Sequence, residues 1–303
     1  MKKCECGHLV PRLLRVGSRI SIMARLFEIV SYSNELTKIE CESSTGDTVL
    51  LVVPPKAYYQ VGAVIRSFQQ EESILISQMR MLKFSIDHAN HVNSALGHCY
   101  DSETLTTDVT TVMQLDGIVN IEHIRAIVGT PEAQAGAIRM VSDRDLSQAL
   151  LEFFFACPKN FPQTAIMNFC SLLIVKPHVL HTHTGEIIDT LLENDLEISA
   201  MESRILDPAF VEEFLDGYKL AWGGYFGESV LELCSDRSLV IQVRHANVVE
   251  KLRELCGPID PEIARAVSPN SLRARFGIDI VRNAVYCTDL EEDAISDCMK
   301  MFN

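Results

Sequence analysis

The sequence repeats itself at a nearly constant offset, and this feature constrains the fold more than any other. Pro54 matches Pro177 and Gly62 matches Gly185, and each pair is separated by 123 residues. Three further matches pair Ile76 with Ile198 at an offset of 122, and Val112 with Val240 and Arg125 with Arg253 at an offset of 128. Offsets that stay this constant over separate segments indicate a tandem duplication.

The repeat sets the predicted domain boundaries. Residues 1–44 read as a tail or β arm, because residues 19–32 alternate apolar and polar side chains as a β-hairpin does. The turn-rich segment 42–47 separates this arm from a first domain at 45–156. The second domain covers 166–303, and residues 157–162 are the predicted linker.

Composition excludes several classes of function. A net charge of -14 argues against broad contact with nucleic acid or an anionic membrane. No apolar run is long enough to cross a bilayer, and the first residues do not form a signal peptide. Ten cysteines without such a signal indicate free thiols in the cytoplasm. Cys4, Cys6 and His8 are too few ligands for a zinc site, so we expect no metal there.

The second copy has clear secondary-structure signals. The apolar run 172–175 predicts a buried strand, and Asp207-Pro208 predicts a helix start. Asn247 and Gly257 bracket a helix as its two caps. The other expected elements are a helix at 184–192, strands at 196–205, 239–243 and 280–286, and a last helix capped by Thr288 or Asp289. This order predicts an α+β fold with a ferredoxin-like antiparallel sheet in each of two tandem domains.

The segment 271–289 carries a recognisable motif. It contains Arg273, Phe-Gly at 276–277, Arg-Asn at 282–283 and Thr-Asp at 288–289. This run resembles the nucleoside diphosphate kinase family, whose members carry Arg-x-x-(Phe-Gly) and then Arg-Asn-x-x-His-x-Ser-Asp. The resemblance implies the same ferredoxin-like fold, and it implies an ancestor that transferred phosphate through a phosphohistidine.

The resemblance also implies nucleotide-binding roles for residues of the second copy. Lys176 would contact nucleotide phosphate or ribose, and Asn283 would hold a ribose hydroxyl. Arg253 and Arg273 would bind phosphate oxygens, for which guanidinium geometry is suited. Tyr225 would stack on the base. Each basic residue taken alone reads as a solvated surface charge, and their shared order is what favours the nucleotide site.

Several positions depart from the family pattern. Tyr286 stands where the family has its histidine, and a phenol with a pKa of about 10 stays protonated near neutral pH. Ile259 replaces a threonine, Leu215 occupies a position expected to hold tyrosine, and Asp297 is left without a histidine to orient. We expect weak nucleotide binding without turnover. His178, His181 and His183 are expected in an exposed loop, not in a metal site.

The first copy departs further from the family. Val53 stands at the lysine position, and the loop ending at Arg139 is shortened. Val141-Ser142-Asp143 follows so soon that we expect the last strand to be deleted. Neither copy places a histidine at the catalytic position.

Residues 255–265, 272–277 and 283–293 are most similar to the seventh, ciliary type of homologue in this family. That resemblance implies a remnant of a DM10-type module at residues 14–22. It also implies a structural lumenal protein of axonemal doublet microtubules in cilia or flagella, or at the basal body, with tubulin as partner. The two domains are expected to pack as an intramolecular pseudo-dimer.

Two alternatives stay open at the level of sequence. One is a nucleotide-binding regulatory module, and the other is a weak residual kinase associated with γ-tubulin complexes. No cofactor is required by the structural reading, and a nucleotide with Mg²⁺ in the second domain is the one candidate.

Overall fold

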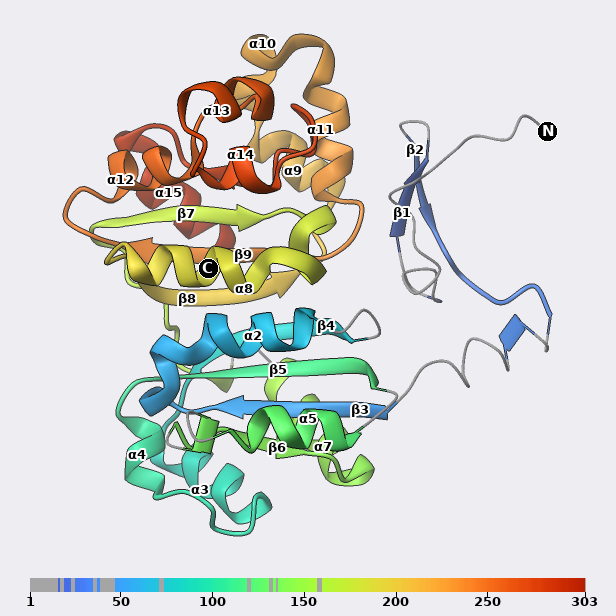
Figure 1. The fold of residues 1–303 in the computed structure, drawn as a ribbon, viewed down its shortest axis with the longest axis vertical. Coiled ribbons are helices and arrows are strands. Elements are labelled where there is room, and N and C mark those ends of the chain that lie inside the picture. The colour runs from blue at the N-terminus through green and yellow to red at the C-terminus, as the bar shows by residue number, and fades with distance from the viewer. Residues whose placement is uncertain are drawn as a thin grey trace.

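The computed structural model describes residues 16, 19–22, 25–34, 37–38, 47–70, 74–118, 121–130, 133–134, 136–156 and 160–302 (Figure 1). Cys4, Cys6 and His8 therefore lie outside the described residues, as do 42–46 of the predicted boundary turn and 157–159 of the predicted linker. Within the described part of the arm, β1 (Arg19–Ile22) pairs antiparallel with β2 (Arg25–Glu28), which confirms the hairpin.

The strands of residues 47–302 that the structure describes form one eight-stranded sheet in which every pair is antiparallel, in the order β10-β7-β9-β8-β4-β5-β3-β6. The first half supplies β3 (Asp47–Val53), β4 (Leu75–Lys83), β5 (Val109–Ile118) and β6 (Arg139–Val141). The second half supplies β7 (Cys170–Val175), β8 (Glu197–Arg204), β9 (Ser238–Arg244) and β10 (Val285–Cys287). Each half has the spatial order second, third, first and fourth strand, which is the ferredoxin-like order expected from the sequence.

Helices cover both faces of this sheet. The face in front in Figure 1 is covered by α2 (Val61–Gln69), α5 (Ile121–Val128), α8 (Pro177–Glu193) and α12 (Val248–Cys256). The opposite face of the first half is covered by α3 (Ile86–Ala95), α4 (Ser102–Thr106) and α7 (Arg144–Leu151). In the second half the corresponding helices are α9 (Pro208–Phe214), α11 (Phe226–Leu233) and α15 (Glu291–Phe302). Three short helices, α10 (Lys219–Trp222), α13 (Pro261–Val267) and α14 (Leu272–Phe276), flank the second half.

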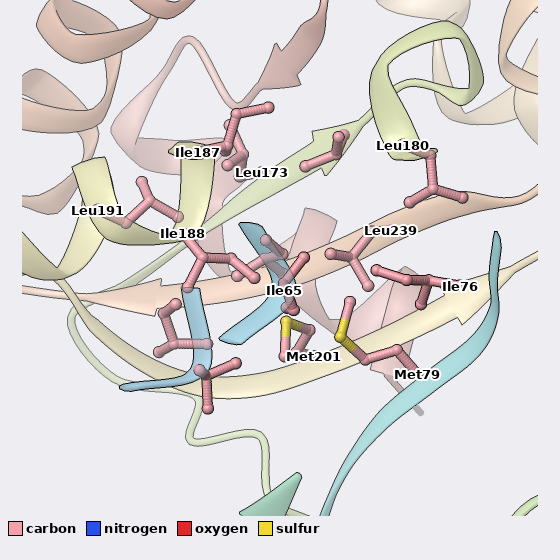
Figure 2. Close-up of a cluster of buried hydrophobic side chains, with 14 of the residues drawn as sticks. Ile65, Ile76, Met79, Leu173, Leu180, Ile187, Ile188, Leu191, Met201 and Leu239 are labelled. Atoms are coloured by element: carbon pink, nitrogen blue, oxygen red, sulfur yellow. The ribbon is translucent and has the colours of Figure 1, made fainter. Parts of the chain in front are cut away.

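The front face holds a single hydrophobic core that runs through both halves (Figure 2). Alternate residues of each strand point into it, as Leu173 and Val175 do in β7, while Leu172 and Ile174 point to the other face. Met79 of the first half and Met201 of the second lie together in this core, close to the junction of β4 and β8. Burying each such side chain stabilises the fold by about 1.5–3 kcal/mol, so the halves share much of their stability.

Two glycines that mark the repeat meet where α2 crosses α8. A Cβ built on Gly62 would lie 2.8 Å from the carbonyl oxygen of Gly185, and one built on Gly185 would lie 2.7 Å from the carbonyl oxygen of Gly62. On the sheet beneath, Arg80 of β4 is paired with Glu202 of β8, and these residues are 122 apart, as Ile76 and Ile198 are. Equivalent positions therefore face each other in both layers, which is local two-fold symmetry.

Most of the predicted elements are confirmed. The helix predicted after Asn247 is α12, and Gly257 ends it with a φ of 76°. Asp207 caps α9 by accepting hydrogen bonds from the backbone N–H groups of Ala209 and Phe210. The strand predicted at 196–205 is β8, which is one residue shorter at each end.

Four expectations are wrong. The histidines at 178, 181 and 183 lie in α8, which begins at Pro177 because proline is favoured in the first turn of a helix. The strand predicted at 280–286 is reduced to β10, because Asp279 and Arg282 close a tight loop before it. Thr288 does not cap the last helix, since its hydroxyl donates to Asp297 within that helix.

The fourth wrong expectation is that the last strand of the first half is deleted. This strand is present as β6 and pairs with β3.

The described end of the predicted linker packs on the first half. Phe161 is buried against Phe84 and Phe154, so it belongs to the core of the first half.

Replacing Gly185 by Ala is expected to destabilise the protein by about 2 kcal/mol. The new Cβ would meet the backbone nitrogen of Arg66 at 2.5 Å, and backbone atoms cannot rotate away. This cost outweighs the ~1 kcal/mol by which alanine favours a helix over glycine. Urea unfolding measures the difference, and the matched control is Gly217→Ala, because no heavy atom lies within 4 Å of that added Cβ. Equal stabilities for the two variants would contradict the close packing of α2 on α8.

Candidate functional site

A pocket of about 450 Å³ opens beside β10 in the second half. Its walls come from the end of α12, the segment after it, α14 and the loop before α15. Among the lining residues are Trp222, Arg253, Ile259, Arg273, Tyr286 and Cys287. The structure thus brings the two predicted phosphate-binding arginines to one pocket with the tyrosine at the histidine position.

Tyr286 is fixed inside the protein by its hydrogen bonds and its ring contacts. Its side chain is 4% exposed, and its hydroxyl is hydrogen-bonded to Oδ2 of Asp297 at 3.1 Å. The ring lies edge-on to Phe214 and to Tyr218, with centroids 5.3 and 6.1 Å away. Burial raises the pKa of Tyr286 well above 10, and the carboxylate of Asp297 adds to the effect. The phenol is therefore a neutral donor to Asp297.

Asp297 does have partners, contrary to the expectation from sequence. The hydroxyl of Thr288 donates to the same oxygen at 2.8 Å, so two hydroxyl groups converge on one buried carboxylate. Hydroxyl donors satisfy a carboxylate that would otherwise be costly to bury. The acid that the family resemblance assigns to a histidine is here part of a Tyr-Asp-Thr hydrogen-bond network.

The two arginines differ in how they are held. Arg273 is buried, and its guanidinium donates to the carbonyl oxygen of Gly257 at 2.7 Å and to that of Val285 at 3.2 Å. Arg253 is half exposed and lies 3.9 Å from Asp289. Two arginines and three acids line the pocket, the acids being Glu250, Glu254 and Asp289. The acids therefore outnumber the arginines among these lining residues, which disfavours an anion.

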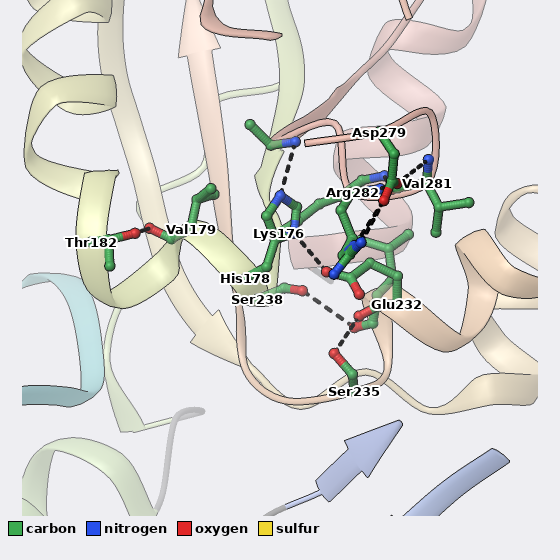
Figure 3. A network of polar contacts seen from close by, with 12 residues as sticks. Lys176, His178, Val179, Thr182, Glu232, Ser235, Ser238, Asp279, Val281 and Arg282 are labelled. Carbon is green, nitrogen blue, oxygen red and sulfur yellow. Dashed lines mark hydrogen bonds and ion pairs between the residues drawn. The ribbon is translucent and has the colours of Figure 1, made fainter. Parts of the chain in front are cut away.

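Lys176 lies outside this pocket's wall. Its side chain is 4% exposed, and Nζ donates to the carbonyl oxygen of Val281 at 2.7 Å (Figure 3). Burial lowers the pKa of this lysine to about 7, although the charge of Glu232 opposes the change. The side chain that the family resemblance assigns to phosphate is thus bonded to the protein's own backbone.

The loop over Lys176 is held by a polar network (Figure 3). Arg282 donates to Asp279 at 2.6 Å, and the backbone N–H of Ala284 donates to Nε2 of His178 at 3.3 Å. His178 therefore carries its proton on Nδ1, which lies 2.6 Å from Oε1 of Glu232. These contacts hold His178 in a buried position in α8, whereas the sequence predicted an exposed loop.

Asn283 and Tyr225 also lie off the pocket wall. The side-chain amide of Asn283 is buried and donates to the carbonyl oxygen of Ile259 at 2.9 Å. Tyr225 stacks on Trp222 with ring centroids 6.1 Å apart, and it is Trp222 that lines the pocket. Nucleotide binding by any of these residues stays a prediction.

Two aromatic residues of the site were missed in the sequence. Leu215 is buried in the core, whereas Tyr218, three residues later, lies against Tyr286. Trp222 stacks on Tyr218 at 4.8 Å and reaches the pocket. The spacing of Tyr218, Trp222 and Tyr225 was the available signal, since it places aromatic side chains at intervals of three to four residues.

The first half has no tyrosine at the position equivalent to Tyr286. Tyr286 pairs with Ile174 on β7, and Met140 pairs with Leu51 on β3. Leu51 and Met140 face the front core, however, whereas Ile174 and Tyr286 face the opposite core, so Met140 is not the equivalent of Tyr286. On the matching face of the first half, Val52 pairs with Arg139, and residues 52 and 174 are 122 apart, as Ile76 and Ile198 are. Arg139 therefore takes the place of Tyr286, and a guanidinium cannot carry a phosphate as an imidazole does.

The part of the chain that the structure describes contains no candidate metal site and no candidate membrane-spanning helix. No group of three or more His, Cys, Asp or Glu side chains there is arranged to hold a metal ion. His183 instead stacks on Phe276 with centroids 4.5 Å apart. None of the helices described is both long and apolar enough to span a bilayer.

Comparison with known proteins identifies the class. Residues 170–303 match the family model of nucleoside diphosphate kinase. The chain is 32% identical over 126 residues to the nucleoside diphosphate kinase of Aquifex aeolicus, covering 41% of this chain and 87% of that protein. The chain therefore belongs to the nucleoside diphosphate kinase family, and its second half is the domain that carries the likeness.

Some relatives in the family are similar to this chain over both of its halves. The chain is 28% identical over 328 residues to "Nucleoside diphosphate kinase homolog 7" of Rattus norvegicus, covering 100% of this chain and 82% of the relative. The mouse protein of the same name is 28% identical over 315 residues, covering 95% and 79%. This protein is thus similar to homologue 7 along its whole length.

The free energy of unfolding is expected to rise with pH because of Lys176. In the folded protein Lys176 loses its proton near pH 7, and in the unfolded chain near 10.5. Between these values the unfolded chain binds one more proton, so stability rises by at most about 1.4 kcal/mol per pH unit. Urea unfolding of wild type and Lys176→Met between about pH 7.5 and 9.5 measures this contribution. A difference between the two proteins that stays flat over this range would contradict it.

Proposed function

We propose that this protein is a non-catalytic, structural member of the nucleoside diphosphate kinase family. The observation that carries the proposal is Tyr286, a buried, neutral phenol hydrogen-bonded to Asp297 at the position of the family's phosphate-carrying histidine. A protonated phenol is a poor nucleophile, and this one would have to break a buried hydrogen bond to react.

The rest of the site supports the same proposal. Lys176 donates to Val281 and the guanidinium of Arg273 to Gly257, so backbone carbonyl oxygens satisfy both side chains. Acids outnumber arginines on the pocket wall. The groups that would stabilise a transferring phosphate are therefore committed to holding the fold together.

The arrangement of the halves supports a tandem pair of kinase-like domains. Each half has the same strand order, and Gly62 meets Gly185 at a local two-fold axis. We propose that the first half is a second, degenerate domain of the family. The two domains then form an intramolecular pseudo-dimer with one shared core.

The finer proposal is a lumenal role in the doublet microtubules of an axoneme, with tubulin as partner. It rests on the full-length similarity to homologue 7 and on a fold retained without its chemistry. With a net charge of -14, contact with acidic tubulin would depend on shape and local basic loops.

Purified protein is expected to transfer phosphate from ATP to GDP at least about 10³-fold more slowly than the Aquifex aeolicus enzyme, a loss of ~4 kcal/mol in transition-state stabilisation. Radiolabelled ATP should give neither an acid-labile phosphoenzyme, as phosphohistidine would be, nor an acid-stable one, as phosphotyrosine would be. Tyr286→Phe is the matched control, because it removes the hydroxyl and keeps the ring. Label on wild type that is lost in Tyr286→Phe would show that Tyr286 accepts phosphate and would overturn the proposal.

The alternative is a nucleotide-binding regulatory module, and the meeting of Arg253 and Arg273 in one pocket favours it. Calorimetric titration with ADP or GDP and Mg²⁺ separates the two. The structural proposal expects a dissociation constant no tighter than about 1 mM, or ~4 kcal/mol. Tighter binding would support the regulatory module, as would its loss in Arg253→Gln.

The axonemal role is tested by location. A tagged copy expressed in ciliated cells is expected to stay with salt-washed doublet microtubules and to be protected from protease until the doublets are opened. A copy found only in the soluble fraction would exclude the lumenal role, and one found only with γ-tubulin complexes would favour the alternative partner.

A further inference from the structure

Two cysteines meet at the wall of the pocket. Cys287 is the last residue of β10, follows Tyr286 and lines the pocket. Cys256 is the last residue of α12, and its thiol is hydrogen-bonded to Cys287. Neither residue is needed for the function proposed above. Both are buried, with Cys287 only 1% exposed, and Cys287 lines the pocket, so a small reagent would reach it from there.

A cation lies against one of the two sulfur atoms. Nη2 of Arg273 donates to Sγ of Cys287 at 3.7 Å. A guanidinium beside a sulfur favours the thiolate, which is the reactive form of cysteine. Arg273 itself is fixed by the carbonyl oxygens of Gly257 and Val285, so this cation is held in place.

The two thiols differ in their protonation. The hydrogen bond from Cys256 lowers the pKa of Cys287, and the charge of Arg273 lowers it further against the effect of burial. Burial raises the pKa of Cys256 well above its usual value. Cys287 is thus the nucleophile of the pair, and Cys256 keeps its proton.

We propose that Cys287 and Cys256 form a peroxide-reactive dithiol site that closes into a disulfide at the pocket wall. The oxidant is a small hydroperoxide, of which hydrogen peroxide is the simplest. Such a site is a pair of one activated sulfur and one resolving thiol in contact, and the structure provides both.

The reaction balances in two steps. The thiolate of Cys287 attacks one oxygen of hydrogen peroxide, the O–O bond breaks, and the leaving hydroxide takes a proton to become water. This leaves Cys287 as a sulfenic acid. The sulfur of Cys256 then attacks Sγ of Cys287, its proton leaves with the hydroxyl as a second water, and the disulfide forms. Two thiols are oxidised and one peroxide is reduced.

The fold offers a matched control pair. Cys170 and Cys298 are also buried and hydrogen-bonded to each other, in the core beneath the opposite face of the sheet. Burial raises the pKa of Cys298, and a hydrogen bond with Gln242 opposes the change. Neither is among the residues that line this pocket. Proximity alone would oxidise both pairs, whereas the proposed site oxidises only one.

Full-length reduced protein treated with a small excess of hydrogen peroxide tests the proposal. After remaining thiols are blocked, mass spectrometry of the peptides is expected to show a Cys256–Cys287 cross-link that dithiothreitol reverses. Loss of the Cys287 thiol should be at least about tenfold faster than loss of the Cys298 thiol. Equal rates, or no cross-link between Cys256 and Cys287, would overturn the proposal.

Two variants assign the roles. In Cys256→Ser the second step is blocked, so Cys287 should gain two oxygen atoms and become a sulfinic acid. Cys298→Ser should leave the cross-link and its rate unchanged. A cross-link that disappears in Cys298→Ser, or a Cys287 that stays unoxidised in Cys256→Ser, would count against an activated Cys287. Phosphate transfer plays no part in either measurement, so their outcome is independent of the function proposed above.

Discussion

The contact between Gly62 and Gly185 is the constraint on which this architecture depends. Only residues without a side chain let α2 and α8 approach until each carbonyl oxygen lies within 3 Å of where the other's Cβ would be. That approach brings β4 and β8 together, and it lets one hydrophobic core run under both helices. The two halves consequently form one sheet and one front layer, while each keeps its own core on the back.

In the second half, the side chains that the family resemblance assigns to nucleotide binding and catalysis are bonded within the fold. Its charged groups are still present, but each has found a partner in the chain: Lys176 on Val281, Arg273 on Gly257, and Asp297 on Tyr286 and Thr288. Buried polar groups need such partners, and a ligand would have to replace them at equal strength. A loss of catalysis at Tyr286 would thus be accompanied by a gain in internal hydrogen bonding.

The sequence predicted the fold well where the signal was local or repeated. The repeat offset located both glycines, and the apolar runs located β7, β8 and β9. It failed where a tertiary contact decides the structure. His178 reads as a loop residue until Glu232, which is 54 positions away, is placed beside it. Thr288 looks like a helix cap in the sequence, but its hydroxyl donates a hydrogen bond to Asp297 instead.

The same division holds for the candidate site. Arg253, Arg273 and Tyr286 were named from the motif and do share a pocket. Tyr218 and Trp222 were missed, because three aromatic residues within eight positions left the alignment ambiguous. The thiol pair at 256 and 287 was out of reach of any pattern, since the two cysteines come from a helix end and a strand that only folding brings together.

The two outermost strands, β6 and β10, are each three residues long. A rim this short offers few free backbone donors and acceptors, so another chain gains little by adding a strand to it. Polymerisation by sheet extension is therefore disfavoured at either end. A larger assembly that incorporates this molecule would have to contact its helices and loops. The molecule would then join such an assembly as a preformed unit whose sheet is not extended.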